Sequence, residues 1–380
     1  MKVTQNTSRL RHLMSLYKMT EDELIELVSK GLKSPLTREM LFSDEIQINH
    51  LKRIDRVFEK GLSYYVNPSE PIKSEGLSIF FRKSNFDTVL NLGTRKIVNH
   101  FEELKISLSS LAKLSDMKIG RKLPVYSIND NPADVAEKMR SLLNPQFKKN
   151  KKTFLIELIN TFANQNIFVF EFVETWNKKE KANIDGMFLS PNVIVLKRQQ
   201  KAFRREIFTL IHEFGHYLLN KEEVEEVNYY NLSSETEKWC NSFAFEFLAD
   251  RFSSQLKQLS HATYINDYHH GIIKSISEQT HLSRLALYTH LLINKLISWV
   301  DYKKVENELE QEWIESYERE ERIKEENKFK GMKMSGSTPK PIKSPLFIST
   351  LQSAFYDGVI SEYDFCKKLN IKPERLNSYL

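Results

Sequence analysis

The sequence has 380 residues, of which 41% are hydrophobic, and a formal net charge of +6 at pH 7. This length allows two or three domains. Its longest apolar runs, such as FLIELI and IFVFEF, are far shorter than the ~20 residues of a membrane span, and the amino-terminal stretch lacks a signal-peptide core. With only two cysteines, Cys240 and Cys366, a disulfide framework is excluded, and we expect a cytoplasmic protein with no membrane partner.

Residues 8–66 are expected to be helical throughout, in the segments SRLRHLMSLYK, EDELIELVSKGL and EIQINHLKRIDRVFEKGLSYYV. Thr20, followed three residues later by Glu23, predicts a capped helix start, and Gly31 suits a helix end. Several short helices favour a helix-turn-helix-like domain over residues 1–75, and a generic helical bundle is the alternative. Residues 1–60 hold 11 Lys/Arg and 9 Asp/Glu, a net charge of only +2, so DNA is a possible partner of residues 1–66 without a strongly basic footprint.

A connecting region is expected over residues 76–124, and the pattern changes in residues 125–300. Asn131 as N-cap and Pro132 in the first turn start one helix, and KTFLIELINTFANQN forms the next. IFVFEFVE is rich in β-forming residues, and DGMFLS and NVIVLKR are strands joined at Ser190-Pro191, a hairpin candidate. Two helices, a small sheet and then another helix is the order found in zincin-type peptidases.

That next helix carries His212-Glu213-Phe214-Gly215-His216 inside FTLIHEFGHYLLN. Residues four apart lie on one helical face, so His212 and His216 can reach the same ion. Glu213 lies about 100° around the helix, where it can touch a metal-bound water without being a ligand. This is the HExxH pattern of zinc peptidases. Apolar neighbours on nearly every side predict a buried helix, and Gly215 predicts close packing of another backbone element.

Two histidines leave a catalytic zinc one protein ligand short of three. Glu237 lies 21 residues after His216, at the start of a second helix, SSETEKWCNSFAFEFLAD. From the residues alone the third ligand stays open, and the other candidates are Glu222, Glu223, Glu225, Glu226, Glu235, Glu246 and Asp250. Asn241, one turn after Glu237, is a candidate to hydrogen-bond a ligand, or a surface polar residue. Cys240 is expected on a different face from Glu237, as a buried inert thiol.

Residues 301–335 are expected to form a charged, solvated helix and a linker, and a partner-binding coiled coil is the alternative. The stripe Val305, Leu309, Trp313 and Tyr317 is the basis of that alternative. SGSTPKPIKSP has the composition of a linker. Residues 336–380 are expected to be a helical tail in which Gly358 and Ser361 separate two helices.

Two blocks of sequence resemble the ImmA/IrrE family of metallo-endopeptidases. One is R-x-x-F-T-L-x-H-E-x-G-H-Y-L-L, from Arg205 to Leu219, and the other is E-x-x-x-N-x-F-A-x-x-F-L, from Glu237 to Leu248. The likeness covers about residues 125–300, and the flanking parts resemble fused members that carry an XRE-like helix-turn-helix. The chain departs from the second block at Ala249-Asp250, where a proline is usual, and this puts the exit of that helix in doubt.

The resemblance implies an α+β, mostly helical protein: a zincin-like metallopeptidase domain with a small sheet, an N-terminal helix-turn-helix-like domain and C-terminal helices. It implies Glu237 as the third ligand of Zn²⁺ beside His212 and His216, with Glu213 as the catalytic base. It also implies a protein substrate such as an XRE-type repressor, and hence a role in transcription regulation. Two imidazoles and a carboxylate also accept manganese.

For such an enzyme we expect Glu213 to take a proton from the attacking water. The segment NVIVL is expected to pair with an extended substrate by strand addition. The residue that stabilises the oxyanion is open, and the candidates are Tyr217, Tyr229, Tyr230, His269 and His270. The alternative function is a DNA-binding transcriptional regulator whose peptidase-like domain serves as a sensor or docking surface. A toxin or defence effector would use the same site.

Overall fold

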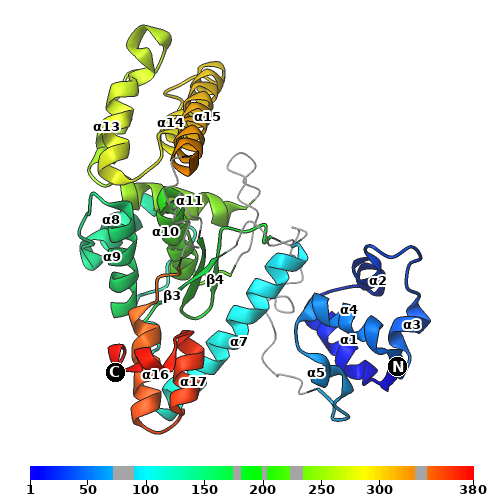
Figure 1. Cartoon of the computed structure of the whole chain (residues 1–380). Coiled ribbons are helices and arrows are strands. Elements are labelled where there is room, and N and C mark those ends of the chain that lie inside the picture. The colour runs from blue at the N-terminus through cyan, green and yellow to red at the C-terminus, as the bar shows by residue number, and fades with distance from the viewer. Residues whose placement is uncertain (72–89, 174–180, 199–202, 223–233, 330–339) are drawn as a thin grey trace. The chain divides into compact units, whose positions relative to one another are not determined.

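The computed structural model describes residues 1–71, 90–173, 181–198, 203–222, 234–329 and 340–380. The chain forms two compact units (Figure 1). The first consists of Met1–Ser107 with Lys179–Asn183, and the second of Leu108–Lys178 with Ile184–Leu380. Within the described residues, no helix is long and apolar enough to cross a membrane.

The first unit is a bundle of short helices with one small sheet. In chain order its elements are β1 (Lys2–Thr4), α1 (Thr7–Leu16), α2 (Glu21–Ser29), α3 (Arg38–Phe42), β2 (Glu45–Gln47), α4 (Ile48–Phe58) and α5 (Leu62–Val66). The predicted start of α2 is confirmed, because the Thr20 side chain accepts a hydrogen bond from the backbone N–H of Glu23. The helices bury a common core that includes Leu24, Leu41 and Ile54.

The prediction of helix throughout residues 8–66 is wrong in the segment from Glu45 to Val66, which holds a strand and two helices separated at Glu59–Gly61. Glu45–Gln47 is a strand that pairs antiparallel with β1, with Lys2 opposite Gln47, so the helix begins at Ile48 instead of at Glu45. The partner strand is about 40 residues away in sequence, and no local periodicity signals such a pairing. Ile46 is fully buried by it.

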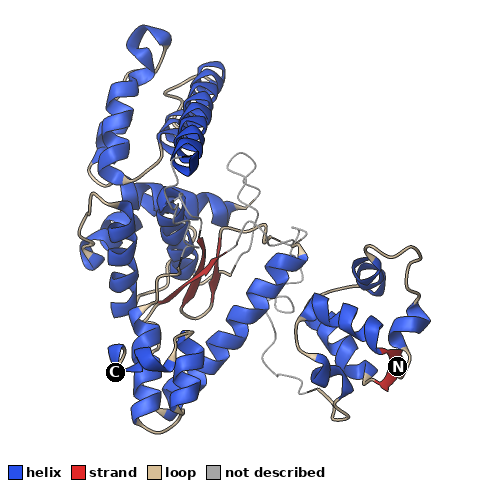
Figure 2. Ribbon diagram, viewed as in Figure 1, coloured by secondary structure: helices blue, strands red, loops and turns tan. Residues whose placement is uncertain are grey.

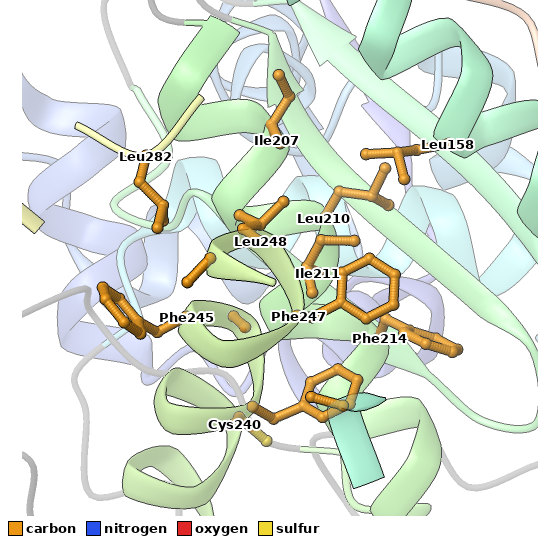
Figure 3. Packing of buried hydrophobic residues seen from close by; sticks show 14 of the residues in the cluster. Leu158, Ile207, Leu210, Ile211, Phe214, Cys240, Phe245, Phe247, Leu248 and Leu282 are labelled. Atoms are coloured by element: carbon orange, nitrogen blue, oxygen red, sulfur yellow. The ribbon is translucent and has the colours of Figure 1, made fainter. Parts of the chain in front are cut away.

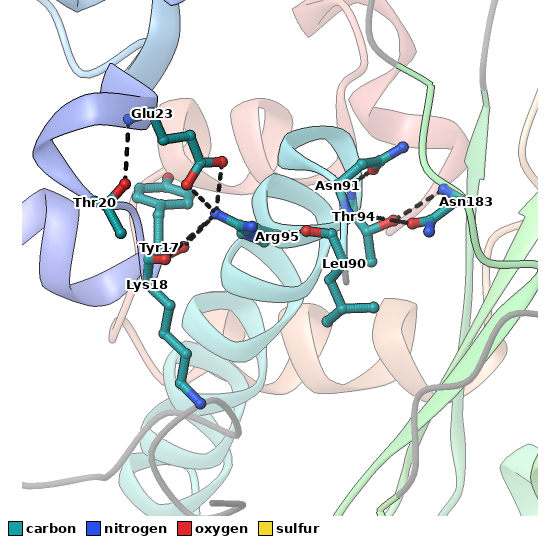
Figure 4. Close-up of polar contacts among 9 residues, drawn as sticks. All are labelled: Tyr17, Lys18, Thr20, Glu23, Leu90, Asn91, Thr94, Arg95 and Asn183. Carbon is teal, nitrogen blue, oxygen red and sulfur yellow. Dashed lines mark hydrogen bonds and ion pairs between the residues drawn. The ribbon is translucent and has the colours of Figure 1, made fainter. Parts of the chain in front are cut away.

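Helix α7 (Leu92–Leu114) begins in the first unit, and Arg95 ties its start to α1 and α2 (Figure 4). The guanidinium donates to the carbonyl oxygen of Tyr17 at 3.2 Å and to both carboxylate oxygens of Glu23 at 3.0 and 3.2 Å. It also donates to the carbonyl oxygen of Leu90 at 2.8 Å. One side chain therefore satisfies acceptors from three segments of this unit.

The second unit is built on a three-stranded sheet of β3 (Phe168–Val173), β4 (Gly186–Leu189) and β5 (Val193–Arg198), in the order β3-β5-β4 (Figure 2). The hairpin predicted at Ser190-Pro191 is confirmed, because β4 and β5 pair antiparallel. β3 pairs with β5 in the parallel sense, with Phe168 opposite Val193. The sheet is buried almost throughout, as expected for a sheet enclosed by helices.

Four helices form the core around this sheet: α8 (Pro132–Leu143), α9 (Lys151–Asn164), α10 (Phe203–Leu219) and α11 (Glu235–Ala249). Asn131 caps α8 with Pro132 in the first turn, as predicted. Figure 3 shows side chains from these helices packed together, among them Leu158, Leu210, Ile211, Phe214, Phe247 and Leu248. Since α10 and α11 each contribute to this core, their mutual position is set by apolar packing.

The rest of the unit is helical, with α12 (Phe252–Lys257), η1 (Tyr264–His269), α13 (His270–Thr280), α14 (Arg284–Ile293), α15 (Trp299–Phe329), α16 (Pro345–Tyr356), α17 (Glu362–Leu369) and η2 (Pro373–Ser378). The helix expected from residue 301 is α15. Val305 is buried, but Trp313 of the same stripe is 65% exposed. The C-terminal segment is attached to the sheet, because the backbone N–H of Ile342 donates to Glu171 of β3 at 2.6 Å.

Candidate metal centre

Helix α10 presents two imidazoles on one face. Nε2 of His212 and Nε2 of His216 are 3.1 Å apart. The His216 side chain is 1% exposed and the His212 side chain 14% exposed, so both rings lie at or below the surface. The turn of helix between them therefore directs two nitrogen atoms at one point.

Glu237, in the first turn of α11, brings a carboxylate to the same point. Its Oε1 lies 3.0 Å from Nε2 of His216, and its Oε2 lies 3.1 Å from Nε2 of His212. Ser234 caps this helix by accepting a hydrogen bond from the N–H of Thr236. His212, His216 and Glu237 are the only three-residue group in the described part of the chain that could hold a metal ion.

The donor atoms fit a small tetrahedral cation. Ligands about 2.1 Å from a tetrahedral zinc are about 3.4 Å apart, close to the separations found here. Two imidazole nitrogens and a carboxylate can converge so closely only if a positive charge lies among them, as a proton or a metal ion. The residues present therefore fit a divalent metal of the zinc type.

The pKa values of Glu237 and His216 reflect two opposing effects, burial and the neighbouring polar groups. Burial would raise the pKa of Glu237, but hydrogen bonds from His212 and His216 hold it far below its usual range. Burial would also lower the pKa of His216, but Cys240 and Glu237 raise it well above the ordinary value. Both shifts favour the charged forms, an imidazolium beside a carboxylate.

Glu213 lies beside the cluster without taking part in it. Glu213 is 5% exposed, and its Oε2 has no hydrogen-bond partner among the described residues. Burial raises the pKa of this carboxyl to about 7, opposed by the neighbouring His216 and His212. A buried carboxylate with a free oxygen and a pKa near neutrality is suited to accept and release a proton.

Gly215 has the role predicted for it. A Cβ atom at this position would lie 3.2 Å from the Cα of Cys240, so the backbone of α11 passes directly against α10 here. The close approach also brings the Cys240 thiol near His216, and the thiol raises the pKa of that imidazole. Cys240 is a buried free thiol, as predicted, and it packs against His216, one of the ligand candidates.

Asn241 lies at the other imidazole. Its Oδ1 is 2.9 Å from Nδ1 of His212. Because an amide oxygen can only accept, Nδ1 of His212 is the donor in this hydrogen bond. The side chain that the sequence offered as a hydrogen-bonding partner thus contacts the first histidine of the motif.

The other carboxylates considered as third ligands have other partners. Glu222 accepts from the backbone N–H of Ser190 at 2.7 Å, and Glu235 pairs with Lys238 at 2.6 Å. Glu246 pairs with Lys257 at 3.0 Å, and Asp250 with Arg140 at 3.1 Å. Glu223, Glu225 and Glu226 lie outside the described residues. Helix α11 ends at Ala249, and Asp250 caps it with a φ of +51°.

The oxyanion candidates are distributed over the unit. Tyr217 is fully buried, and Arg121 stacks on its ring at 3.8 Å, so it belongs to the core. His269 contacts the carbonyl oxygen of Ser260, while His270 contacts the hydroxyl of Tyr288. Tyr229 and Tyr230 lie outside the described residues.

The expectation that NVIVL pairs with substrate is wrong. This segment is β5, and both of its edges are occupied, one by β3 and the other by β4. β4 has no second partner among the strands that the structure describes. The sequence could not predict which strand is central and which lies at an edge, because each has the pattern of a buried apolar strand.

Two residues at this site were not predicted from the sequence: Gly186, the first residue of β4, and Asp185, which precedes it. A Cβ atom on Gly186 would lie 2.9 Å from Oε1 of Glu213 and 2.5 Å from Cγ2 of Thr209. Asp185 forms an ion pair with Arg205 of α10. The available signal was a glycine at the edge of a strand pattern, which often marks close approach of another group.

Comparison with protein families agrees with this geometry. Residues 164–281 match a family model, Peptidase_M78, described as the IrrE N-terminal-like domain. The matched span contains all of α10 and α11, and hence the three ligand candidates and Glu213. Comparison with curated proteins and with solved structures gave no significant match. The family match supports the ImmA/IrrE peptidase family for this domain and a metallopeptidase-like function.

Proposed function

We propose that this protein is a zinc-dependent endopeptidase that cleaves a partner protein, such as a helix-turn-helix repressor. The observation that carries the proposal is the buried convergence of His212, His216 and Glu237 beside the carboxylate of Glu213, whose Oε2 has no hydrogen-bond partner among the described residues. A buried cluster of this kind is costly to fold unless it binds a cation.

The three ligands would leave a zinc ion with an open position, as catalytic zinc sites have. Zinc bound here would act as a Lewis acid, polarising a carbonyl group and increasing the acidity of a nearby water. Glu213 would accept the proton of the attacking water and donate it to the leaving amine. Its pKa of about 7 supports both steps, because the carboxyl can then exist in either protonation state near neutral pH.

An extended peptide is the substrate that the sheet suits. β4 precedes the metal-binding helix, abuts Glu213 through Gly186, and has an outer edge with no strand partner in the described residues. Such an edge offers backbone hydrogen bonds to a segment added as a further strand. The likeness to the ImmA/IrrE family supports a regulatory protein as the source of that segment.

Glu213→Gln tests the proposed base. The amide keeps the size of the side chain but cannot accept the water's proton, so cleavage should fall by at least about 100-fold, the lower range of general-base contributions. Zinc content should be unchanged, since Glu213 is not a ligand. The measurement is cleavage of purified helix-turn-helix repressor proteins and of dye-labelled casein, with zinc content determined on the same samples.

Glu235→Gln is the matched control, because this residue of α11 is exposed and forms an ion pair with Lys238 at the surface. It should cleave as the wild type does. Full activity in the Glu213→Gln variant would contradict the mechanism. Zinc binding by a wild-type chain that cleaves no protein would favour the regulator whose peptidase-like domain only senses or docks.

A further inference from the structure

The carboxylate of Glu213 is held against the first residue of β4. A methyl group on Gly186 would lie 2.9 Å from Oε1 and 3.0 Å from Cγ of Glu213, distances that leave no room for it. The backbone of Gly186 therefore limits how far the Glu213 side chain can move toward β4. Any displacement of the start of β4 changes where the carboxylate can lie.

Two contacts within the second unit hold Asp185, the residue that precedes Gly186. The backbone N–H of Lys197 in β5 donates to the carbonyl oxygen of Asp185 at 2.7 Å. The carboxylate of Asp185 pairs with Arg205 in the first turn of α10. These contacts join the start of β4 to its neighbouring strand and to the helix that carries Glu213.

On the upstream side, the same segment is held by the first unit, to which Lys179–Asn183 belongs. The Thr94 hydroxyl donates to Oδ1 of Asn183 at 2.7 Å and accepts from the Asn183 backbone N–H at 3.0 Å. The side chain of Asn91 donates to the carbonyl oxygen of Lys181 at 2.7 Å. Figure 4 shows Thr94 and Asn183 facing one another at the start of α7.

Thr94 itself is fully buried, and its neighbour Arg95 connects it to the N-terminal helices. Arg95 bonds to the carbonyl oxygen of Tyr17 after α1 and to the carboxylate of Glu23 in α2. The position of Asn183 is therefore determined by residues of the first unit. Only Ile184 and Asp185 stand between Asn183 and Gly186, a span of about 10 Å in extended chain.

We propose that Asn183–Gly186 is a positioning segment through which the N-terminal unit sets the place of the Glu213 carboxylate. Thr94 and Asn183 are positioning residues in this proposal, since neither touches the metal-binding cluster. A partner that binds the N-terminal helices and shifts Asn183 would then change the catalytic rate without removing a metal ligand. This proposal rests on the proposed peptidase function for its effect on rate, but the mechanical link is independent of that function.

Hydrogen exchange of the full-length chain tests the link directly. Thr94→Val removes both hydrogen bonds between Thr94 and Asn183, and Asn183→Ala removes the one that Oδ1 accepts. Exchange in peptides covering residues 184–189 should accelerate about tenfold in either variant, the factor that loss of about 1.4 kcal/mol makes in an opening equilibrium. Thr94→Ser keeps the hydroxyl and should exchange almost as the wild type does.

The matched control is Thr161→Val. Thr161 is also partly buried, and its hydroxyl donates to the carbonyl oxygen of Glu157 within α9, remote in sequence from the segment. It should leave exchange in residues 184–189 unchanged. Wild-type exchange there in both Thr94→Val and Asn183→Ala would overturn the proposal, and so would equal acceleration in Thr161→Val.

Casein hydrolysis separates this proposal from the proposed function. With dye-labelled casein, Thr94→Val and Asn183→Ala should lower kcat several-fold while KM and zinc content stay near the wild-type values, because the loss concerns the base and not substrate binding. A fall in zinc content that accounts for the lost rate would contradict a positioning role. If the wild-type chain cleaves nothing yet exchange accelerates as expected, the link stands and the peptidase function fails.

Discussion

His212, one imidazole of the candidate metal centre, is hydrogen-bonded by a residue of α11. Oδ1 of Asn241 accepts from Nδ1 of His212 at 2.9 Å, and the thiol of Cys240 lies behind His216. Such partners fix the tautomer and orientation of a ligand, so they affect metal affinity without touching the metal. Asn241 of one helix therefore orients the first histidine of the other.

Asn241→Ala should weaken zinc binding about tenfold, the lower range for loss of a ligand's hydrogen-bond partner. Asn241→Asp keeps an acceptor for Nδ1–H and should bind zinc at least as tightly as the wild type. Competition of the apo-protein against a chelating zinc indicator measures both. The exposed neighbour Ser242→Ala is the control, and equal affinities in Asn241→Ala and Ser242→Ala would refute the role assigned to Asn241.

At the scale of secondary-structure elements, the contact between α10 and α11 is what assembles the site. His212 and His216 stand on one helix and Glu237 on the other, and both helices contribute to one apolar core. The helices approach most closely at Gly215, where a Cβ would lie 3.1 Å from the sulfur and 3.2 Å from the Cα of Cys240. A side chain at Gly215 would therefore push α11, and Glu237 with it, away from the histidines.

Gly215→Ala should lower the free energy of unfolding by about 1–3 kcal/mol, the usual cost of overpacking, and should weaken zinc binding. Gly271→Ala is a matched control, because Gly271 is also helical and a Cβ there meets nothing within 4 Å. That change should instead stabilise the protein by about 0.5–1 kcal/mol. Urea unfolding compares the variants, and a stabilising Gly215→Ala would contradict the close contact.

A buried ionic group joins β3, β5 and α10. Arg198 pairs with Glu206 at 2.5 Å and lies 3.7 Å from Glu171, so one guanidinium serves two carboxylates. Burial raises the pKa of Glu171 to about 7, opposed by the hydrogen bond from Ile342 and the charge of Arg198. The folded state therefore binds a proton at Glu171 that the unfolded state has already released.

This raised pKa makes stability depend on pH with a definite sign. The contribution of Glu171 is fully present below its ordinary pKa of 4.5 and is lost as the pH rises through about 7. Glu171→Gln cannot titrate, so its stability relative to the wild type should rise between pH 5 and pH 8, by up to about 3 kcal/mol. Urea midpoints at both pH values measure this, beside the exposed control Glu315→Gln. A difference between variant and wild type that stays constant with pH would contradict the assignment.

Across the molecule, local patterns were sufficient to predict the candidate metal centre but not its surroundings. His212 and His216 are four residues apart on one helix, and the glutamate of the second block lies on the helix that packs against it. Spacing and periodicity therefore predicted the central residues. The contact of Gly186 with Glu213 and the central place of β5 depend on pairing between distant segments, which no local pattern records.

The N-terminal unit illustrates the same limit. Its helices follow the amphipathic pattern of the sequence, but the pairing of β1 with β2 crosses about 40 residues and could not be predicted. The helix-turn-helix interpretation stays a prediction, since the five short helices described within residues 1–71 are compatible with other bundles. Two sets of hydrogen bonds could be found only from the three-dimensional structure. Arg95 bonds to Tyr17 and Glu23, and Thr94 bonds to Asn183.

The central claim is that His212, His216 and Glu237 bind one zinc ion, and metal content tests it most directly. The purified wild-type chain should hold one zinc per chain, and His216→Ala and Glu237→Ala should hold almost none. Glu235→Ala, which changes an exposed carboxylate two residues before Glu237, should keep the metal. A wild-type chain without metal after zinc has been supplied, or full zinc content in either ligand variant, would contradict the account.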